Sequence, residues 1–67
     1  MKNTPPLPDQ LRAARDAKGW TQVQAAIKLG CDPNTWARWE QGRARPDILT
    51  LERIAKLLGR RLVIELR

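Results

Sequence analysis

The apolar positions of the chain recur at helical spacing in four separate stretches. Leu11 and Ala14 share one side of residues 8–18. Five apolar residues share one side of residues 48–58: Ile48, Leu51, Ile54, Ala55 and Leu58. Side chains three and four residues apart lie on the same face of an α-helix. The pattern predicts helices at about 8–18, 21–29, 33–41 and 48–58. The expected fold class is therefore all-α, a compact bundle of four to five short helices.

Typical helix boundary residues stand at the ends of these stretches. Thr21 followed by Gln24 has the spacing of a capping box, and Asp32 and Asp47 stand where N-caps are expected. Glycine follows each predicted helix, at Gly19, Gly30, Gly42 and Gly59. The second helix is expected to contribute apolar contacts from a set of four residues: Val23, Ala26, Ile27 and Leu29.

Residues 22–41, QVQAAIKLGCDPNTWARWEQ, have the pattern of a helix-turn-helix. Ala26 precedes the turn at Gly30 by four residues, Cys31 follows as a small apolar residue, and Asp32 and Pro33 open the next helix. A turn of this kind projects the second helix outward, where it can enter the major groove of DNA.

A helical wheel divides the helix at 33–41 into two sides. Trp36 and Trp39 fall together, whereas Asn34, Ala37, Arg38 and Gln41 lie on the opposite side. The two Trp residues are interpreted as the buried stripe of an amphipathic helix. The alternative is a platform on which the bases of a single strand stack.

The polar side of this helix has the chemistry needed to read bases. Arg pairs with guanine and Asn with adenine in the major groove, and a small Ala contacts the methyl group of thymine. Predicted base contacts are Pro33, Asn34, Ala37 and Arg38, and predicted phosphate contacts are Gln22, Thr35, Gln41, Arg43 and Arg45. The alternative is an ordinary solvated polar face.

Arg15 lies on the same stripe as Leu11 and Ala14, so its charge needs a partner. Glu40 borders the apolar stripe of the helix at 33–41, and the two are predicted to form a structural ion pair. The alternative is that Arg15 extends to water and Glu40 is exposed.

The two ends of the chain differ in character from the bundle. Residues 1–7 are expected to form a flexible arm, residues 8–59 the helix-turn-helix domain, and residues 60–67 a strand-like dimerisation tail. Leu62, Ile64 and Leu66 share one strand face, and a lone strand leaves backbone groups unpaired. Pairing with the tail of a second copy would satisfy them, with Leu57 joining that dimer interface. A frayed tail or a longer last helix are the alternatives.

Composition narrows the functional classes. The 67 residues carry a net charge of +6, which favours an anionic partner such as nucleic acid. With one Cys and no His, a zinc site built from soft ligands is excluded and the commonest general base is missing. The seven acidic residues mostly fit caps or ion pairs, so no catalytic residue, metal or cofactor is predicted. A lone thiol, together with the lack of a secretory or membrane-spanning stretch, predicts a cytoplasmic protein without a membrane partner.

The chain resembles the XRE family, the lambda repressor and Cro-like helix-turn-helix domains, over about residues 9–59. The residues that carry the resemblance are Leu11, Arg15, Gly19, Thr21, Gln22, Ala26, Leu29, Gly30, Thr35, Arg38, Trp39, Glu40, Gly42, Pro46, Leu51, Ile54, Ala55, Leu58 and Gly59. The resemblance implies operator binding by a dimer, a phosphate role for Gln22, base contacts from Pro33, Asn34 and Arg38, and the pairing of Arg15 with Glu40.

The chain departs from the family pattern at several positions. Ala25 replaces the usual Leu and Trp36 the usual Ile or Val, which we interpret as a compensating change of volume. Cys31 replaces a usual Val as a small core residue, with a redox-sensing thiol as the alternative. Asp32 replaces a common Ser, and no fifth helix is predicted.

The predicted function is a homodimeric repressor or autoregulator of a phage or mobile element, bound to an inverted-repeat DNA operator and lacking a small-molecule ligand. The first alternative is the antitoxin of a toxin–antitoxin pair, which represses its own operon and also binds a toxin. A protein-interaction module without a DNA role is the second, and RNA binding is a further alternative.

Overall fold

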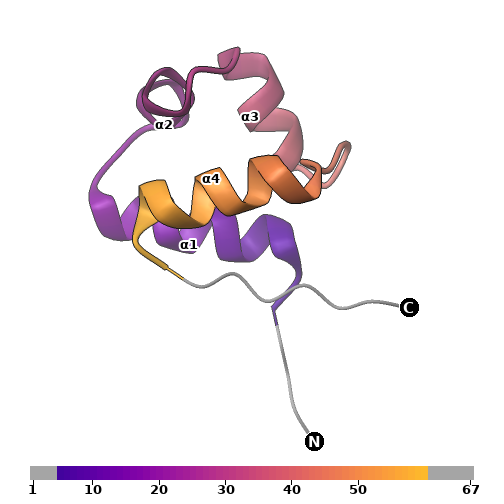
Figure 1. The fold of residues 1–67 in the computed structure, drawn as a ribbon, viewed down its shortest axis with the longest axis horizontal. Helices are drawn as coiled ribbons and strands as arrows, with labels where there is room; N and C mark the ends of the chain where they lie inside the picture. Colours follow the sequence, from indigo (N-terminus) through magenta and orange to yellow (C-terminus); the bar gives the residue numbers. More distant parts are fainter. Residues whose placement is uncertain (1–4, 61–67) are drawn as a thin grey trace, which may run out of the picture.

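The computed structural model describes residues 5–60, which form four helices connected by short turns and one longer loop (Figure 1). These are α1 (Leu7–Lys18), α2 (Gln22–Leu29), α3 (Pro33–Glu40) and α4 (Ile48–Leu58). The all-α prediction is confirmed, and residues 5–60 contain no strand. The strand predicted at the C-terminal end lies outside the described residues.

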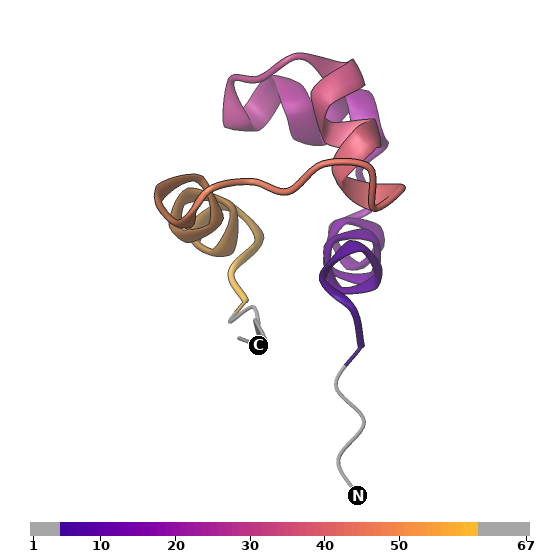
Figure 2. The same cartoon turned by 90° about the vertical axis from the view of Figure 1, so that its right-hand side faces the viewer.

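Helices α1 and α4 lie roughly parallel in the lower half of Figure 1, with α2 and α3 above them. The loop after α3 passes from the end of α3 to the start of α4, as Figure 2 shows from the side. All four helices turn an apolar side toward one interior. Its buried side chains are Leu11, Ala14, Ala25, Ala26, Leu29, Trp36, Trp39, Leu51, Ile54 and Leu58.

The two Trp residues of α3 form part of this core. Trp36 is fully buried and Trp39 nearly so, and their ring centroids lie 5.7 Å apart at an interplanar angle of 57°. A tilted pair at this separation is a favourable aromatic arrangement. The interpretation of Trp36 and Trp39 as an apolar stripe is confirmed, and the base-stacking platform is wrong.

Helix α2 contributes less to the core than its apolar content suggests. Val23 is 51% exposed and Ile27 69% exposed, so the prediction that both make core contacts is wrong. Only the side that carries Ala25, Ala26 and Leu29 is buried. Val23 and Ile27 lie one turn apart on a neighbouring side of this eight-residue helix, and no other helix of residues 5–60 covers that side. Ile48, expected on the buried side of α4, is likewise 60% exposed.

The predicted boundary residues form the expected caps. At α2, Thr21 Oγ1 accepts from the Gln24 amide while Gln24 Oε1 accepts from the Thr21 amide, which completes the capping box. Gly30 ends the helix with φ at 90°, a left-handed conformation that costs other residues about 1–2 kcal/mol. The Cys31 amide then bonds back to the Ala26 carbonyl, which turns the chain sharply toward α3.

Candidate nucleic-acid interface

Helix α3 starts immediately after the turn that ends α2, and its first residues are exposed. Asp32 Oδ1 accepts from the Asn34 amide at 2.8 Å, so the predicted N-cap is present. Among the predicted base contacts, Pro33, Asn34 and Arg38 are exposed and Ala37 is half-buried. The structure therefore presents the predicted reading side of α3 to solvent, with its core side occupied by Trp36 and Trp39.

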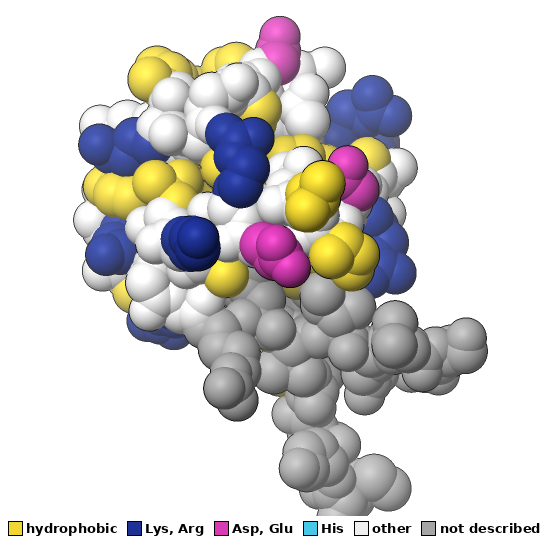
Figure 3. Space-filling model, in the orientation of Figure 1, with side chains coloured by type: hydrophobic (Ala, Val, Ile, Leu, Met, Phe, Trp, Pro, Cys, Tyr) yellow, Lys and Arg dark blue, Asp and Glu magenta, His cyan; other side chains and the backbone are white. Residues whose placement is uncertain are grey.

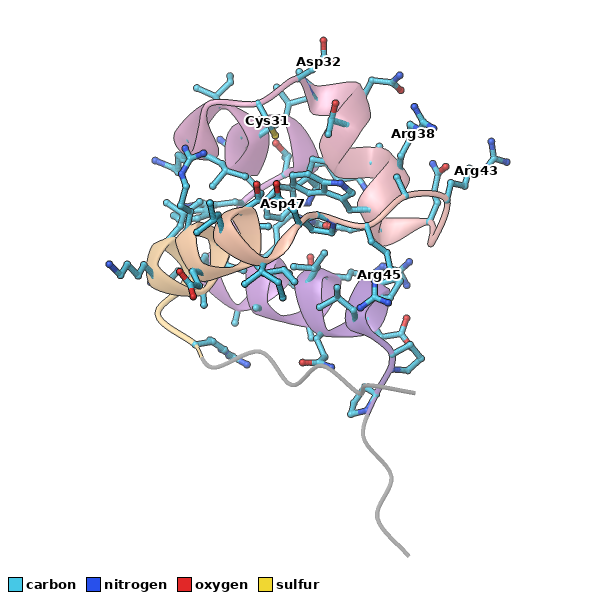
Figure 4. All side chains as sticks on the ribbon, turned by 45° about the vertical axis from the view of Figure 1, so that its right-hand side comes forward. Cys31, Asp32, Arg38, Arg43, Arg45 and Asp47 are labelled. Atoms are coloured by element: carbon cyan, nitrogen blue, oxygen red, sulfur yellow. The ribbon has the colours of Figure 1, made fainter. Side chains whose placement is uncertain are left out.

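The predicted phosphate contacts flank this side of α3. Gln41 is exposed at the end of the helix, and Thr35 is half-buried near its start. The Arg43 amide bonds to the Arg38 carbonyl at 3.0 Å, because Gly42, with φ at 76°, turns the chain back on itself. Both Arg side chains extend outward on the same side of the molecule (Figure 4).

The loop after α3 sends alternate residues to opposite sides. Ala44 packs against the core and Pro46 is buried, whereas Arg43 and Arg45 are exposed. Arg45 lies apart from the other two Arg residues and lower in the view of Figure 4. The structure thus brings Arg38 of α3 and Arg43 of the following loop together. Arg45 is on the same loop as Arg43, but its side chain lies apart from both.

Arg15 and Glu40 form the ion pair expected from the sequence. Arg15 Nε lies 2.6 Å from Glu40 Oε2, and the second terminal nitrogen lies 3.0 Å from Oε1. The remaining terminal nitrogen donates to the Trp20 carbonyl at 2.8 Å. Planar, two-point contact of this kind fixes orientation as well as charge. The pair ties α1 to the end of α3 and so sets the direction of the exposed helix.

The same carboxylate accepts two further hydrogen bonds that sequence reasoning missed. Gln22 Nε2 donates to Oε1 at 3.0 Å, and Trp36 Nε1 donates to Oε2 at 2.5 Å. The four-residue spacing of Trp36 and Glu40 was a signal for the second bond. Burial acts to raise the pKa of Glu40, but hydrogen bonds from Arg15, Gln22 and Trp36 together hold this pKa below its usual value.

Gln22, which is predicted to contact a DNA phosphate, also contacts Glu40 within the domain. It is the first residue of α2, half-buried, and one of its amide N–H groups is directed at Glu40. The amide nitrogen carries a second N–H group, since a Gln side chain has two donors. The contact with Glu40 fixes the side chain of Gln22 close to the end of α3.

Cys31 behaves as a small residue at the edge of the core. It is half-buried and packs against the core cluster. Burial raises the pKa of the Cys31 thiol, the charge of Asp32 raises it further, and Arg53 acts in the opposite direction. The thiol is thus held in its protonated form, which opposes the reactivity of a redox sensor.

The remaining site predictions concern assembly and metals. Leu57, placed in a dimer interface, is half-buried and packs against the core of its own chain. Leu62, Ile64 and Leu66 lie outside the described residues. Within residues 5–60, no three His, Cys, Asp or Glu side chains group as a metal site would require. The helices of this part of the chain are too short and too polar to cross a membrane.

A helix that follows a tight Gly turn, packs through Trp36 and Trp39 and exposes Asn34 and Arg38 is the arrangement of a helix-turn-helix. Residues 7–63 match the family described as helix-turn-helix domain. The chain belongs to the helix-turn-helix domain family. This family binds DNA and is normally non-enzymatic.

A curated relative is similar over most of the chain. It is a SPbeta prophage-derived uncharacterised helix-turn-helix-type transcriptional regulator of Bacillus subtilis (strain 168). The two are 33% identical over 51 residues, which cover 76% of this chain and 47% of the relative. The chain thus spans about half the length of the relative that it matches.

Proposed function

We propose that this helix-turn-helix domain is a sequence-specific transcriptional regulator of the XRE type that represses as a homodimer on an inverted-repeat operator. The observation that carries the proposal is the exposed side of α3, where Asn34 and Arg38 stand free of the core with Arg43 beside them. Arg and Asn are the side chains that most often read guanine and adenine in the major groove.

The type of DNA contact proposed for each residue follows from its position on α3 or near it. The N-terminal part of such a helix enters the major groove. The residues proposed to contact base edges there are Pro33, Asn34, Ala37 and Arg38. Arg43 and Arg45 on the following loop contact phosphates, as do Gln22, Thr35 and Gln41 around the helix. Gln22 does so with the amide N–H that Glu40 leaves unused.

Different observations support the regulatory role and the dimer. The relative named as a prophage-derived transcriptional regulator supports a role in a phage or mobile-element operon. One short exposed helix reads few bases, so pairing two copies on an inverted repeat supplies the specificity that a single copy lacks. The alternating residues 61–67 provide the contact between copies.

Selection of bound sequences from random DNA duplexes tests the function directly. The expected result is an inverted repeat whose half-site centres lie about 34 Å apart, one turn of the duplex. Arg38→Ala should lose about 1–3 kcal/mol of specific binding and relax one base position in each half-site. Equal weakening on every sequence would make Arg38 a phosphate contact, and recovery of no preferred sequence would contradict the proposed function.

Deletion of residues 61–67 tests the dimer. We expect the shortened chain to be a monomer by light scattering and to bind the operator far more weakly, while the helices stay folded by circular dichroism. A shortened chain that keeps the mass of a dimer would contradict the assignment of the tail.

A further inference from the structure

Of the ten Lys and Arg side chains of residues 5–60, seven lie outside the interface at α3, and two of these, Arg12 and Arg15, lie near Glu40. The other five are exposed cations on or directly after the other three helices, and we name this surface the basic face: Lys18, Lys28, Arg53, Lys56 and Arg60. Figure 3 shows several Lys and Arg side chains on the left and in the middle of the molecule, with one acidic side chain beside them and further Lys and Arg side chains at the right edge. In Figure 1, α3 is on the opposite, right-hand side.

Contacts across three helices make the basic face continuous. Lys18 Nζ and Lys28 Nζ lie over the same Trp20 ring, 5.9 Å and 4.9 Å from its centroid. Arg53 donates to the carbonyl of Leu29, the residue after Lys28, at 2.6 Å. These contacts join the ends of α1 and α2 to the middle of α4.

The remaining cations extend this surface along α4. A Cβ built on Gly59 would lie 3.8 Å from Lys18 Nζ, which places Lys18 beside the residue before Arg60. Arg53 and Lys56 are three residues apart on the exposed side of α4, and Arg60 follows the left-handed cap at Gly59. The rise of a helix separates Arg53 and Lys56 by roughly 4.5 Å along its axis.

None of these five cations forms an ion pair within residues 5–60, and the nearest acid in sequence on α4 is Glu52, one turn before Lys56. Helix α2 contains no acidic residue, and Asp16 of α1 pairs with Arg15 at 3.1 Å. Among residues 5–60, no Asp or Glu lies within ion-pair distance of any member of the basic face. Positive charge near helix C-termini stabilises each helix locally, which explains where these cations are placed. It does not neutralise them, so the surface keeps a positive field directed away from α3.

We propose that the basic face holds the phosphate backbone of a second DNA duplex, so that one domain contacts two DNA segments, one through α3 and one through the ends of α1, α2 and α4. The contact through α3 rests on the proposed function, and the contact through the basic face does not. An interface between proteins has a largely apolar centre, whereas all five side chains here are charged. A row of unpaired cations is the feature that binds duplex phosphates without regard to sequence.

The test uses the full chain and two duplexes. An immobilised duplex carrying the selected operator is loaded with protein, and retention of a fluorescent duplex of unrelated sequence is measured against salt. The variant Lys28→Gln with Lys56→Gln keeps both side chains long and removes two charges. We expect this variant to retain at least tenfold less of the second duplex than the wild type does. Its affinity for the operator should stay within about twofold of the wild-type affinity. The salt slope of second-duplex binding should fall by about 1.8 for two lost phosphate contacts.

The matched control is Arg43→Gln with Arg45→Gln, which removes the same charge from the loop after α3. It should weaken operator binding and leave retention of the second duplex, per loaded protein, unchanged. Circular dichroism and the thermal midpoint establish that both variants are folded. If the first does not fold, Lys28→Gln with Arg60→Gln takes its place.

Equal retention of the second duplex by the wild type and by the Lys28 and Lys56 variant would overturn the proposal. So would retention of an acidic polypeptide by the wild type without retention of a second duplex, because the surface would then suit a protein partner. Transfer of energy between two labelled duplexes of unrelated sequence measures bridging without an operator. A protein that bridges them and selects no sequence would refute the proposed function alone.

Discussion

Trp36 donates its indole N–H to the carboxylate of Glu40, one turn later on α3, at 2.5 Å. Trp36 is the largest fully buried side chain of the described residues, and it is a polar contact as well as a packing element. The same carboxylate binds Arg15 and Gln22. A single acidic group therefore positions α3, which carries the residues proposed to read DNA, against α1 and α2.

Replacing Trp36 by Phe should separate the hydrogen bond from the packing. A hydrogen bond to a charged group contributes about 1.5–3 kcal/mol, so Trp36→Phe should destabilise the domain by that much more than Trp39→Phe. The second substitution is the matched control, because the Trp39 side chain is not hydrogen-bonded within residues 5–60. Urea unfolding measures both free energies, and equal losses would show that the Trp36 hydrogen bond contributes nothing.

The Glu40 carboxylate should make stability depend on acid pH. Because its pKa lies below the usual 4.5, the folded protein holds the charged form more strongly than the unfolded chain does. Its contribution is complete above about pH 4.5 and is lost as the pH falls through the folded pKa. Glu40→Gln should cost about 3–5 kcal/mol at pH 7, since Arg15 loses its buried partner and keeps only the exposed Asp16, and this difference should shrink between pH 5 and pH 3.

Unfolding in urea at several pH values compares the two proteins. Hydrogen bonding with Thr50 lowers the pKa of Asp47, so this carboxylate also affects stability in acid. Asp47 and the other carboxylates are present in both proteins, so their contributions cancel in the difference. A difference that stays constant from pH 7 to pH 3 would contradict the role given to Glu40.

Gly30→Ala should destabilise the domain through its backbone alone. The new Cβ would lie 3.9 Å from the nearest atom, a nitrogen of Arg53, so it meets no clash. The cost of a left-handed conformation should lower the free energy of unfolding by about 1–2 kcal/mol, or a thermal midpoint by roughly 4–16 °C. Gly30→Asn is the control, since Asn tolerates this conformation better and should lose less. Equal losses of stability in the two variants would show that the left-handed backbone conformation is not the reason why residue 30 is Gly.

Arg43→Ala and Arg45→Ala should each weaken binding to every duplex alike. Both residues are exposed on the loop after α3, where Ala44 and Pro46 turn inward. Each lost phosphate contact should lower the slope of log K against log salt by about 0.9. Titrations of operator and unrelated duplexes at several salt concentrations measure the slopes. Unchanged slopes in both variants would remove the loop from the interface.

The features that depend on local sequence were predicted well. Caps at Thr21, Asp32 and Asp47 and the glycine helix ends involve neighbours within a few residues, so the sequence contains the information needed. The division of α3 into a Trp side and a polar side follows from helical periodicity for the same reason.

Features that depend on how helices meet were not predicted as well. The Arg15–Glu40 pair was expected because a cation on an apolar stripe needs a partner, but nothing local points Gln22 at Glu40 from another helix. Val23 and Ile27 were placed in the core because periodicity alone cannot tell which side of a short peripheral helix is covered. The separation of Arg45 from Arg38 and Arg43 likewise depends on the path of a loop.

The carboxylate of Glu40 also determines which helices of the domain unfold together. Its hydrogen-bond donors come from α1, α2 and α3, so detaching any one of these helices would leave a buried charge short of partners. These three helices are therefore expected to open as a single cooperative unit, with one shared free energy for their slowest amide hydrogens. Helix α4 contributes no donor to this carboxylate, and it is held instead by its core residues Leu51, Ile54 and Leu58.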